Sequence, residues 1–574
     1  MSLTIPELLR NTAGNVQLPV KAGKEVVISP KRIVVVGGGA AGISFLKVVR
    51  EFQEQQKDLN WDVVLYEHRD DIGGIWYEQK NKPDPPILPE SSIYSRLRTN
   101  TPHPHNTYYK FPFPPGTDLY PIHTKLHEYM KSVASHFKLE SAVRLRHNVT
   151  SAQWIGNSTQ GYWRLRIERP ITYQESSDWH SFSPLNQQII PKDATHETIF
   201  ENFDHLIVAT GRYHFPHEGN FPGRETWLAH RNNLSNGSRD IRHSIWYEDA
   251  TPYVNKTALV VGGGASAQDI TRFVAEVYQS ISKKSIYPPG GDIIRKARLS
   301  HFTRDAVHFE DGSFETDIDS VILATGYELR VPFLEVGGSL IYDPTVTSRN
   351  TTHIHPPPHL PLTSNGPYVR PLYRHTMSLS SQFPPTALFV LSFARHPPPQ
   401  ATAVAQSIFA TRLIANPALV DPHRIKLLRE LEEYEERLRN IGLNPDVSGH
   451  RLVDWNHDYQ ESSNFQESLI NFLMERNVTR LPLRGSNHTY VEDWRRRMDT
   501  NPSLVVTNKN WLELEARGET EALLRGREKE EDWIELLDCL RALDGTKQPT
   551  CQASTPLQPA YISSGHNSCV VERR

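Results

Sequence analysis

Residues 32–52 read RIVVVGGGAAGISFLKVVREF. The stretch starts with apolar residues, passes through three glycines spaced Gly-x-Gly-x-x-Gly (Gly37, Gly39 and Gly42), and continues with apolar residues at helical spacing. Strand, glycine turn and helix in this order are typical of a turn that binds a dinucleotide pyrophosphate. The first glycine makes the tight turn, the second lets the backbone approach the phosphates, and the third lets the helix pack closely on the strand. The stretch therefore predicts an α/β fold with a Rossmann-like parallel sheet.

An acidic residue follows this first glycine turn where a ribose would be recognised. Residues 61–66, WDVVLY, are predicted to form the next strand, and Glu67 follows them directly. A carboxylate at this place can accept hydrogen bonds from both hydroxyls of an adenosine ribose. We therefore predict that the first turn binds FAD. The alternative is a glycine-rich turn beside a surface glutamate.

A second glycine turn of the same kind lies in residues 256–274, KTALVVGGGASAQDITRFV. Gly262, Gly264 and Ala267 occupy its three spaced positions, and alanine is an accepted replacement for the third glycine. An apolar strand precedes the turn and a helix is expected to follow it. Two nucleotide-binding turns in one chain predict two Rossmann-like units.

The charge after the second turn differs from that after the first. The strand that follows is expected to end at Lys283 and Lys284 rather than at an acid. An ammonium group attracts a 2′-phosphate that a carboxylate would repel, so the second site is predicted to bind NADPH in preference to NADH. The alternative is that both lysines are ordinary surface charges.

Composition and cysteine placement narrow the possible chemistry. The chain has 574 residues and a net charge of -3, which gives no global attraction to nucleic acid. Its three cysteines are Cys539, Cys551 and Cys569, so no cysteine pair is available in the main body to receive electrons from a flavin. Electrons are expected to pass to dioxygen instead. No metal site is predicted, because the histidine-rich loop near residue 355 has no carboxylate at a known ligand spacing.

No targeting or membrane segment is expected. The first 30 residues lack the apolar run of a secretory signal, and no later stretch approaches about 18 consecutive apolar residues. We therefore predict a cytoplasmic protein without a membrane anchor. Whether it forms a homo-oligomer is left open by the sequence.

Further motifs follow the two turns in a characteristic order. They are HRDDIGGIW (68–76), YSRLRTNTPHPHNTYYKFPFPPG (94–116), DHLIVATGRY (204–213), IRHSIWY (241–247), SAQD (266–269), SVILATGY (320–327) and PLYRHTMSLSSQFPPTALFV (371–390). Over roughly residues 30–415 this set resembles the flavin-containing monooxygenases, which oxygenate nitrogen and sulfur atoms.

The resemblance implies a reaction. NADPH reduces the bound FAD, dioxygen adds at flavin C4a, and the resulting hydroperoxyflavin transfers one oxygen atom to a nucleophilic nitrogen or sulfur of a small molecule. The substrate supplies the lone pair, so the protein needs no nucleophile of its own. Two alternatives remain: a Baeyer–Villiger monooxygenase acting on ketones, and a non-catalytic module that binds FAD and NADPH. The substrate, and the choice between nitrogen and sulfur, are not assigned.

The resemblance also implies roles for single residues. Asn100 matches the asparagine beside the flavin and is the predicted catalytic residue. Gly74, Trp76 and Thr99 match positions that contact the flavin, and Ser266 opens the helix after the second turn. The alternatives are an Asx-turn before a proline for Asn100 and a packed core position for Trp76.

Two departures from the family pattern stand out. The signature F-x-G-x-x-x-H-x-x-x-(Y/F) is half present, because His243 and Tyr247 fit whereas Gly237 and Arg239 replace its Phe and Gly. Residues 228–239 also read as an inserted polar loop. Both features leave substrate access and hinge behaviour open.

Five regions are predicted along the chain. Within them, the proline-rich stretches 83–89, 354–361 and 396–400 are expected to be loops. Residues 421–442 are expected to form a helix with Ile425, Leu428, Leu431 and Leu438 on its apolar face, and 528–543 another. The regions are a first part of an FAD domain (30–215), an inserted NADPH domain (216–327), a second part of the FAD domain (328–420), a helical extension (421–545) and a disordered tail (546–574).

Overall fold

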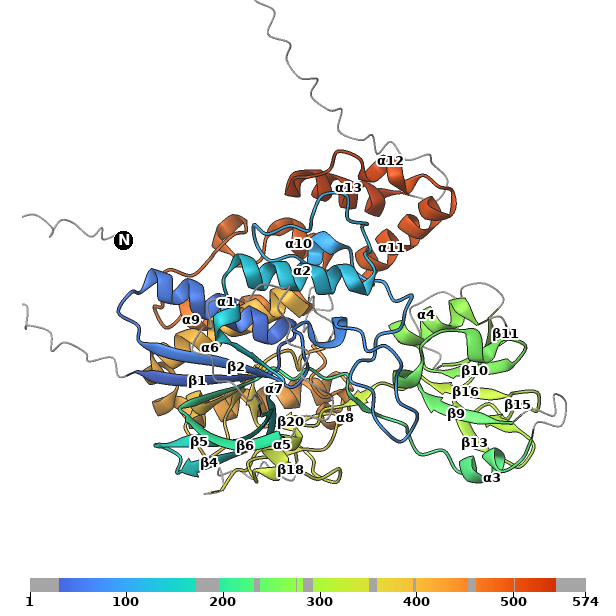
Figure 1. Cartoon of the computed structure of the whole chain (residues 1–574), viewed down its shortest axis with the longest axis horizontal. Helices are drawn as coiled ribbons and strands as arrows, with labels where there is room; N and C mark the ends of the chain where they lie inside the picture. Colours follow the sequence, from blue (N-terminus) through green and yellow to red (C-terminus); the bar gives the residue numbers. More distant parts are fainter. Residues whose placement is uncertain are drawn as a thin grey trace, which may run out of the picture.

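The structure is a computed structural model of the whole chain, drawn in Figure 1. It describes residues 30–171, 196–231, 238–274, 276–281, 293–349, 359–395, 399–452, 461–499 and 501–543. Lys283, Lys284, Gly237 and the predicted tail 546–574 lie outside the described residues.

The first α/β unit is built on a seven-stranded sheet in the order β21-β22-β23-β7-β1-β2-β3. Its central strands run parallel, as their continuous apolar runs predict. Near one edge, β22 runs antiparallel to both of its neighbours, β21 and β23. The strands are β1 (Lys31–Val36), β2 (Trp61–Glu67), β3 (Val143–Leu145), β7 (His205–Val208), β21 (Leu372–Tyr373), β22 (Met377–Ser378) and β23 (Leu388–Val390).

Both faces of this sheet are covered, and the alternation of side chains along β1 shows how. Ile33 and Val35 are fully buried in one hydrophobic cluster and Val34 and Val36 lie in another. The first cluster lies under helices α1 (Ala40–Gln55), α2 (His123–His136), α6 (Pro399–Ala415) and α9 (Glu461–Met474), seen above the sheet in Figure 1.

The second cluster packs the opposite face against a three-stranded antiparallel sheet of β4 (Asn148–Gly156), β5 (Gly161–Pro170) and β6 (His196–Phe203). Helix α5 (Pro332–Val336) packs on β4, and a small sheet of β18 (Ile341–Tyr342), β19 (Thr363–Ser364) and β20 (Val369–Arg370) completes this side.

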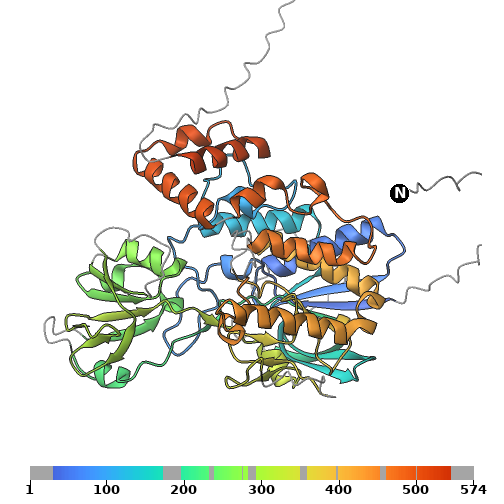
Figure 2. The same ribbon diagram turned by 180° about the vertical axis from the view of Figure 1, so that it is seen from behind.

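The second α/β unit has a five-stranded parallel sheet in the order β12-β11-β10-β16-β9. Figures 1 and 2 show it beside the first unit from two opposite directions. The predicted α/β fold with two Rossmann-like units is confirmed. Its elements are β9 (Asp240–His243), β10 (Thr257–Val261), α4 (Ala265–Phe273), β11 (Glu276–Ser280), β12 (Ile294–Lys296) and β16 (Ser320–Leu323), with α3 (Arg224–Leu228) and a side sheet of β13 (Leu299–Phe302), β14 (Val307–Phe309) and β15 (Phe314–Glu315).

Two short strands join the units. β8 (Phe215–Pro216) enters the second unit and β17 (Tyr327–Glu328) leaves it, and the two pair antiparallel, with Tyr327 opposite Pro216. The chain therefore crosses between the units at two adjacent places. Such a paired crossing fixes where the second unit attaches.

Seven α-helices make up most of the described chain after residue 423. They are α7 (Arg424–Asn440), α8 (Pro445–Ser448), α9, α10 (Asp493–Met498), α11 (Asn501–Ala516), α12 (Thr520–Leu524) and α13 (Glu530–Ala542). The predicted helices near 421–442 and 528–543 correspond to α7 and α13. One predicted loop is wrong in part, since α6 begins inside the stretch 396–400, at Pro399. Proline is tolerated in a first helical turn because the amide there needs no intrahelical partner.

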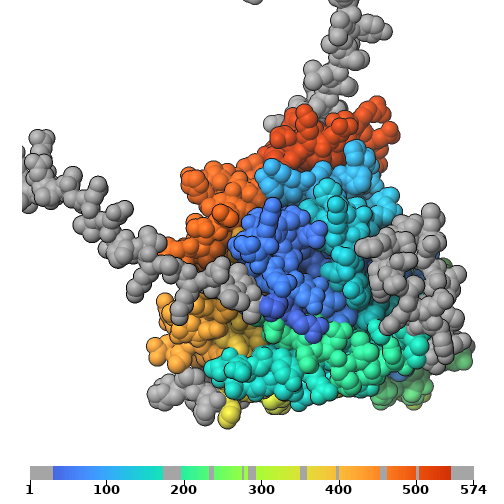
Figure 3. Space-filling model, turned by 60° about the vertical axis from the view of Figure 1, so that its left-hand side comes forward, coloured from blue at the N-terminus to red at the C-terminus, as the bar shows by residue number. Residues whose placement is uncertain are grey.

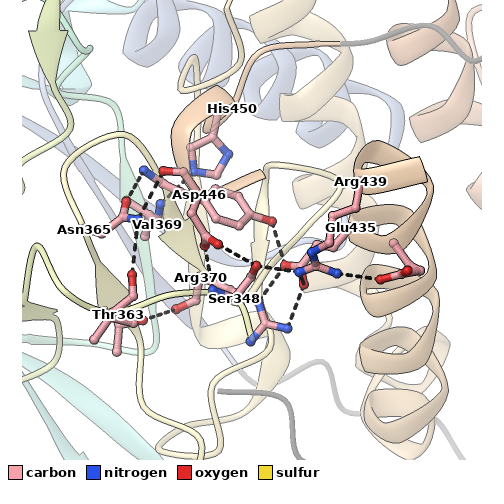
Figure 4. Close-up of polar contacts among 12 residues, drawn as sticks. Ser348, Thr363, Asn365, Val369, Arg370, Glu435, Arg439, Asp446 and His450 are labelled. Carbon is pink, nitrogen blue, oxygen red and sulfur yellow. Dashed lines mark hydrogen bonds and ion pairs between the residues drawn. The ribbon is translucent and has the colours of Figure 1, made fainter. Parts of the chain in front are cut away.

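The buried face of α7 also differs from the prediction. Ile425 is 55% exposed, whereas Glu435 is 1% exposed. The carboxylate of Glu435 accepts hydrogen bonds from Nε and Nη2 of Arg370 at 2.6 and 3.0 Å and from the Tyr368 hydroxyl at 3.0 Å (Figure 4). A buried ion pair across to β20 therefore sets the rotation of α7, a constraint that apolar spacing does not contain.

The described residues contain neither a single membrane-spanning helix nor a cluster of metal-ligating side chains. No single helix among them is long and apolar enough to span a membrane, while the pair Gln400–Ala415 and Pro417–Asn440, bent by 106°, meets that criterion only when taken together. No cluster of three or more His, Cys, Asp or Glu side chains suited to a metal ion occurs among them.

Candidate functional site

The first glycine turn has the backbone geometry that its spacing predicts. Gly37 has φ +111°, and a Cβ atom there would lie 2.5 Å from the carbonyl oxygen of Ala209 at the end of β7. A Cβ on Gly42 would lie 2.0 Å from the Gly37 oxygen. Side chains are therefore excluded at both positions, and α1 starts close against the end of β1.

A second pair of glycines closes on this turn. Gly73 donates its amide proton to the Gly38 oxygen at 2.9 Å. Gly74 has φ +56°, and a Cβ on it would lie 2.9 Å from Cα of Gly39. The half-buried Trp76 follows in the short 3₁₀ helix Gly74–Trp76. The structure thus brings together two of the predicted flavin-contacting segments, whose contacting glycines are 35 positions apart in sequence.

Glu67 lies under the first turn rather than at the surface. Its side chain is buried, with Oε2 accepting the Gly38 amide at 2.6 Å and Oε1 the Arg69 amide at 2.9 Å. Burial alone would raise the pKa of this carboxyl, but hydrogen bonds from His68 and from the two amides lower it. Glu67 is therefore a buried carboxylate that holds the glycine turn in place. Its predicted contact with a ribose stays a prediction.

His68 completes this acidic cluster. Its ring lies between Glu67 and Glu90, at 2.9 and 2.6 Å. Burial opposes protonation, but the two carboxylates raise the pKa of His68 to about 9. The cluster therefore carries a cation that offsets the charge of Glu67 near neutral pH.

The second glycine turn repeats the first and leaves more space. Gly262 has φ +139°, and a Cβ on it would lie 2.3 Å from the carbonyl oxygen of Ala324, at the end of β16. In the first turn of α4, Ala267 is fully buried and Ser266 is half-buried. A Cβ on the exposed Gly264 would meet no atom within 4 Å. The N-terminus of α4 is thus open to an approaching phosphate group.

The segment that carries Asn100 connects the two turns. Ser91 donates its hydroxyl proton to the Ile75 oxygen beside the first turn at 2.6 Å. The Tyr94 hydroxyl donates to Asp269 Oδ2 in α4 at 2.5 Å. Tyr94 also packs edge-on against Tyr247, with ring centroids 5.3 Å apart. Residues 91–94 therefore contact elements that belong to both nucleotide-binding turns.

Asn100 itself is exposed, and Thr99 beside it is buried. The Thr99 amide donates to the Pro121 oxygen at 3.0 Å, whereas its hydroxyl has no hydrogen-bond partner within the described part of the chain. The buried side chain of Gln400, at the start of α6, also has no partner there. Buried polar atoms without partners are unfavourable, so these groups fit a site that a bound polar ligand completes.

The half of the family signature that is present lies at the crossing between the units. His243 Nε2 donates to the Gly326 oxygen at 2.9 Å, and its Nδ1 accepts the Ile245 amide at 3.1 Å. Burial lowers the pKa of His243 to about 4, so the ring is neutral in this bonding pattern. Arg239 is buried and lies with its guanidinium 4.8 Å from the centre of the Trp227 ring. Arg239, which stands where the family signature has glycine, therefore packs in the core of the second unit.

Sequence reasoning missed three of these features: the Tyr94–Asp269 hydrogen bond, the buried Gln400 side chain and the bonding of Glu67 to the turn. Tyr94 and Asp269 both lie in motifs that the sequence singled out, but only folding brings them together. The positions of Lys283 and Lys284 stay untested, since both lie outside the described residues.

Comparisons with known proteins agree with this geometry. A family model described as flavin-binding monooxygenase-like matches residues 30–178 and 289–344. Flavin-containing monooxygenase FMO GS-OX3 of Arabidopsis thaliana is 28% identical over 355 residues, which are 58% of this chain and 67% of that protein. Senecionine N-oxygenase of Tyria jacobaeae is 25% identical over 387 residues, 65% of this chain and 69% of that protein.

Solved structures share the fold. S-allyl-L-cysteine S-oxygenase from Allium sativum superposes with a TM-score of 0.61 at 20% identity, covering 90% of this chain and 99% of its own. Tmm from a Pelagibacter strain superposes with a TM-score of 0.56 at 17% identity, covering 83% of this chain and 93% of its own. The two glycine turns, the segment between them and these matches agree, and over residues 30–178 and 289–344 the chain is similar to the flavin-binding monooxygenase-like family.

Proposed function

We propose that this chain is an NADPH- and dioxygen-dependent monooxygenase that transfers one oxygen atom to a nucleophilic nitrogen or sulfur of a small molecule. The observation that carries the proposal is the segment 91–100, which bonds to Ile75 beside the first glycine turn and to Asp269 in the helix after the second, and which ends at the exposed Asn100. NADPH, a proton and dioxygen are consumed, and the products are NADP⁺, water and the N-oxide or S-oxide.

The first unit is suited to FAD. Its Gly37–Gly42 turn faces Gly74, Glu67 lies beneath it, and Thr99 offers a buried hydroxyl that lacks a partner among the described residues. When bound, FAD supplies the acceptor for the hydride of NADPH and the place where dioxygen is activated. The protein residues orient the cofactor and keep water away from it.

The second unit is suited to NADPH. We propose that residues 216–327 form a domain inserted between two parts of an FAD domain, 30–215 and 328–420. The paired strands β8 and β17 support this division, since they lie at both of its boundaries. Gly264 and Ser266, at the open start of α4, would hold the pyrophosphate, and Lys283 and Lys284 would bind the 2′-phosphate.

Asn100 is proposed as the group that meets the reacting atoms. Its neutral amide offers a donor and an acceptor without adding charge. The side chain is exposed and forms no hydrogen bond with another described residue. Its amide donor and its amide acceptor are therefore both available to a ligand. A correctly held amide favours oxygen transfer to the substrate over loss of hydrogen peroxide.

The choice of nitrogen or sulfur as the oxygenated atom rests on relatives. One curated relative is named senecionine N-oxygenase, and the Allium protein of the same fold is named an S-oxygenase. Both atoms present a lone pair to an electrophilic oxygen, so one arrangement of the protein serves either. These names favour this chemistry over Baeyer–Villiger oxidation of ketones.

The test uses the purified full-length protein reconstituted with FAD. A thioether, a tertiary amine and cyclohexanone are each incubated with NADPH and air, and the organic product is identified by mass spectrometry. We expect an S-oxide or N-oxide. Lactone as the only product would favour the Baeyer–Villiger alternative, and failure of NADPH to bleach the flavin without oxygen would favour a non-catalytic module.

A further inference from the structure

The last helices of the described chain pack on the segment that carries Asn100. We call α10–α13 (residues 493–542) the C-terminal cap. Figure 3 shows this orange-red part of the chain lying against the blue and cyan part of the first unit. The cap and the first unit share one hydrophobic cluster, in which Leu119 and Tyr120 join Trp494, Met498, Trp511, Leu514, Leu523, Trp533, Leu536, Leu537 and Leu540. The cap is therefore built onto the residues that neighbour Asn100.

Arg495 of α10 makes the central polar contact. Its side chain is 8% exposed. Nη1 donates to the His105 backbone oxygen at 3.1 Å and Nη2 donates to the Thr107 hydroxyl at 2.9 Å. Glu492 lies 3.4 Å from its Nε and balances the charge. One buried guanidinium thus holds two residues of the loop that follows Asn100.

Asn106, between these two residues, carries the contact back towards Asn100. Its Nδ2 donates to the Thr101 hydroxyl at 2.7 Å and to the Thr101 backbone oxygen at 3.4 Å. Thr101 is the residue next to Asn100. Hydrogen bonds at both ends, joined by the backbone of residues 105–107, therefore connect Arg495 to the neighbour of Asn100.

The backbone on either side of Asn100 is also hydrogen-bonded to residues 119–121. The Thr99 amide donates to the Pro121 oxygen at 3.0 Å and the His103 amide donates to the Leu119 oxygen at 2.8 Å. Leu119 is fully buried in the cluster shared with the cap. The backbone on both sides of Asn100 is thus fixed to residues that pack under the cap.

Two more side chains of the cap reach this loop. Glu515 Oε1 accepts a hydrogen bond from Arg98 Nη1 at 2.7 Å, and both side chains are partly exposed. The ring of Trp533 meets His103 edge-on, with centroids 4.4 Å apart. Burial lowers the pKa of His103 to about 3, so His103 packs against Trp533 as a neutral ring.

From these contacts we propose that the C-terminal cap positions Asn100 for oxygen transfer, with Arg495 as the main positioning residue. The inference rests on the proposed function, because it assigns the cap a part in that same site. An exposed loop residue keeps a defined place only if its neighbours are held, and a displacement of about 1 Å at a reacting group can cost about 100-fold in rate. Arg495 supplies that hold from outside the two nucleotide-binding units.

The first experiment measures coupling. Arg495→Met keeps side-chain length and removes the guanidinium, and hydrogen peroxide formed per NADPH consumed is compared with that of the wild type. We expect a several-fold rise, with FAD content and the anaerobic rate of flavin reduction unchanged. Arg497→Met is the matched control, since Arg497 lies on the same helix but pairs with Asp538 within the cap. It is expected to behave as wild type.

A double variant tests whether Arg495 acts through Asn100. If it does, Asn100→Ala with Arg495→Met leaks no more peroxide than Asn100→Ala alone. The proposal would be contradicted if the rise in peroxide per NADPH in the double variant equalled the sum of the rises in the two single variants. Should Arg495→Met fail to fold, Glu515→Gln replaces it, since the loss of a partly exposed ion pair costs little stability. A smaller rise in peroxide is then expected, and an unchanged leak would contradict the proposal.

The second experiment needs no reaction. Hydrogen exchange is measured on the FAD-free full-length protein, and the amides of Thr99 and His103 are followed. We expect both to exchange at least several-fold faster in Arg495→Met than in Arg497→Met. Equal exchange in the two variants would overturn the positioning role. A wild type that oxygenates no substrate would overturn the proposed function instead, and the exchange result would still decide what Arg495 does.

Discussion

A methyl group on Gly37 would lie 2.5 Å from the carbonyl oxygen of Ala209, and the backbone of Gly37 has a positive φ of +111°. Gly262 stands in the same relation to Ala324, at 2.3 Å. In each unit the first glycine of the turn packs against the alanine of an Ala-Thr-Gly segment at the end of the neighbouring strand. Both nucleotide-binding turns are therefore built by the same close backbone approach.

Gly37→Ala is expected to lower both stability and FAD content. The substituted residue would have to adopt a strained backbone, at a cost of about 1–3 kcal/mol, and would also contact the Ala209 oxygen. Thermal unfolding of the FAD-free protein and flavin absorbance after reconstitution measure the two effects. Gly264→Ala is the matched control, because its methyl group would enter open space at a negative φ. It should keep its melting temperature and lose only affinity for NADPH.

Asn100→Ala should uncouple the reaction. Without the amide, NADPH still reduces the flavin, but more of the oxygen is released as hydrogen peroxide. Peroxide formed per NADPH consumed is the measurement, with FAD content as the check on folding. The control is Asn60→Ala, at an exposed asparagine directly before the start of β2. It should form as much peroxide per NADPH as the wild type. Unchanged coupling in Asn100→Ala would remove this residue from the reaction.

Replacing both Lys283 and Lys284 by alanine should weaken NADPH binding far more than NADH binding. Only NADPH carries the 2′-phosphate that an ammonium group attracts. Dissociation constants of the two nucleotides, measured at low and high salt, test this, and the difference should shrink as salt screens the charges. Equal loss for both nucleotides would assign the lysines to the general surface.

Glu435→Ala should destabilise the protein by about 3–5 kcal/mol, because it leaves the buried Arg370 guanidinium without its carboxylate. Pairing it with Arg370→Met should recover much of this loss, since no buried charge then remains. Denaturant unfolding measures both. Glu128→Ala removes an exposed ion pair with Lys125 and should cost less than about 1 kcal/mol. A loss that small in Glu435→Ala would show that water reaches the pair drawn in Figure 4.

Two buried histidines near this pair form a directed series of hydrogen bonds. The Val369 amide donates to His450 Nε2 at 3.1 Å, so the proton of neutral His450 is on Nδ1. That Nδ1 lies 3.0 Å from His375 Nδ1, which therefore accepts. His375 Nε2 then donates to the Tyr434 hydroxyl at 3.2 Å. A further proton on either ring would place two hydrogens face to face.

The protein is therefore expected to lose stability in mild acid. Burial lowers the pKa of His375 to about 4 and that of His450 well below its usual value. In the unfolded chain these histidines take up protons near pH 6.5, whereas in the folded protein they stay neutral. The free energy of unfolding is therefore highest above pH 6.5 and falls as the pH drops towards 4, by about 3 kcal/mol for His375. Urea unfolding from pH 7 to 4.5 measures the slope. His375→Gln should flatten it, and the exposed His423→Gln should not.

The parts of the fold that depend on local pattern were predictable. β1, β2, β10 and β16 read as continuous apolar runs, and both glycine turns follow from spacing alone, because the strain at Gly37 and Gly262 is a property of a few adjacent residues. The apolar face of α7 was predicted wrongly at Ile425. Its rotation depends on Glu435 meeting Arg370, which comes from a distant strand.

The candidate site was predictable only as separate pieces. The sequence singled out Asn100, Gly74 and Gly264 by motif, but not the contacts that arrange them. The Tyr94–Asp269 and Arg495–His105 hydrogen bonds join residues more than 150 positions apart, and no periodicity contains such a pairing.

The seven-stranded sheet has a consequence for how the chain is made. β7 ends at residue 208, but its partner β23 begins only at residue 388, after the whole second unit. All strands of the second unit's parallel sheet lie between residues 240 and 323. During synthesis from the N-terminus, the five-stranded sheet of the second unit can therefore form before β23 has been made. Until then, β7 in the seven-stranded sheet keeps one unpaired edge. Translation order thus gives the second unit the first opportunity to complete its parallel sheet, whereas the first unit completes its own only when β23 returns beside β7.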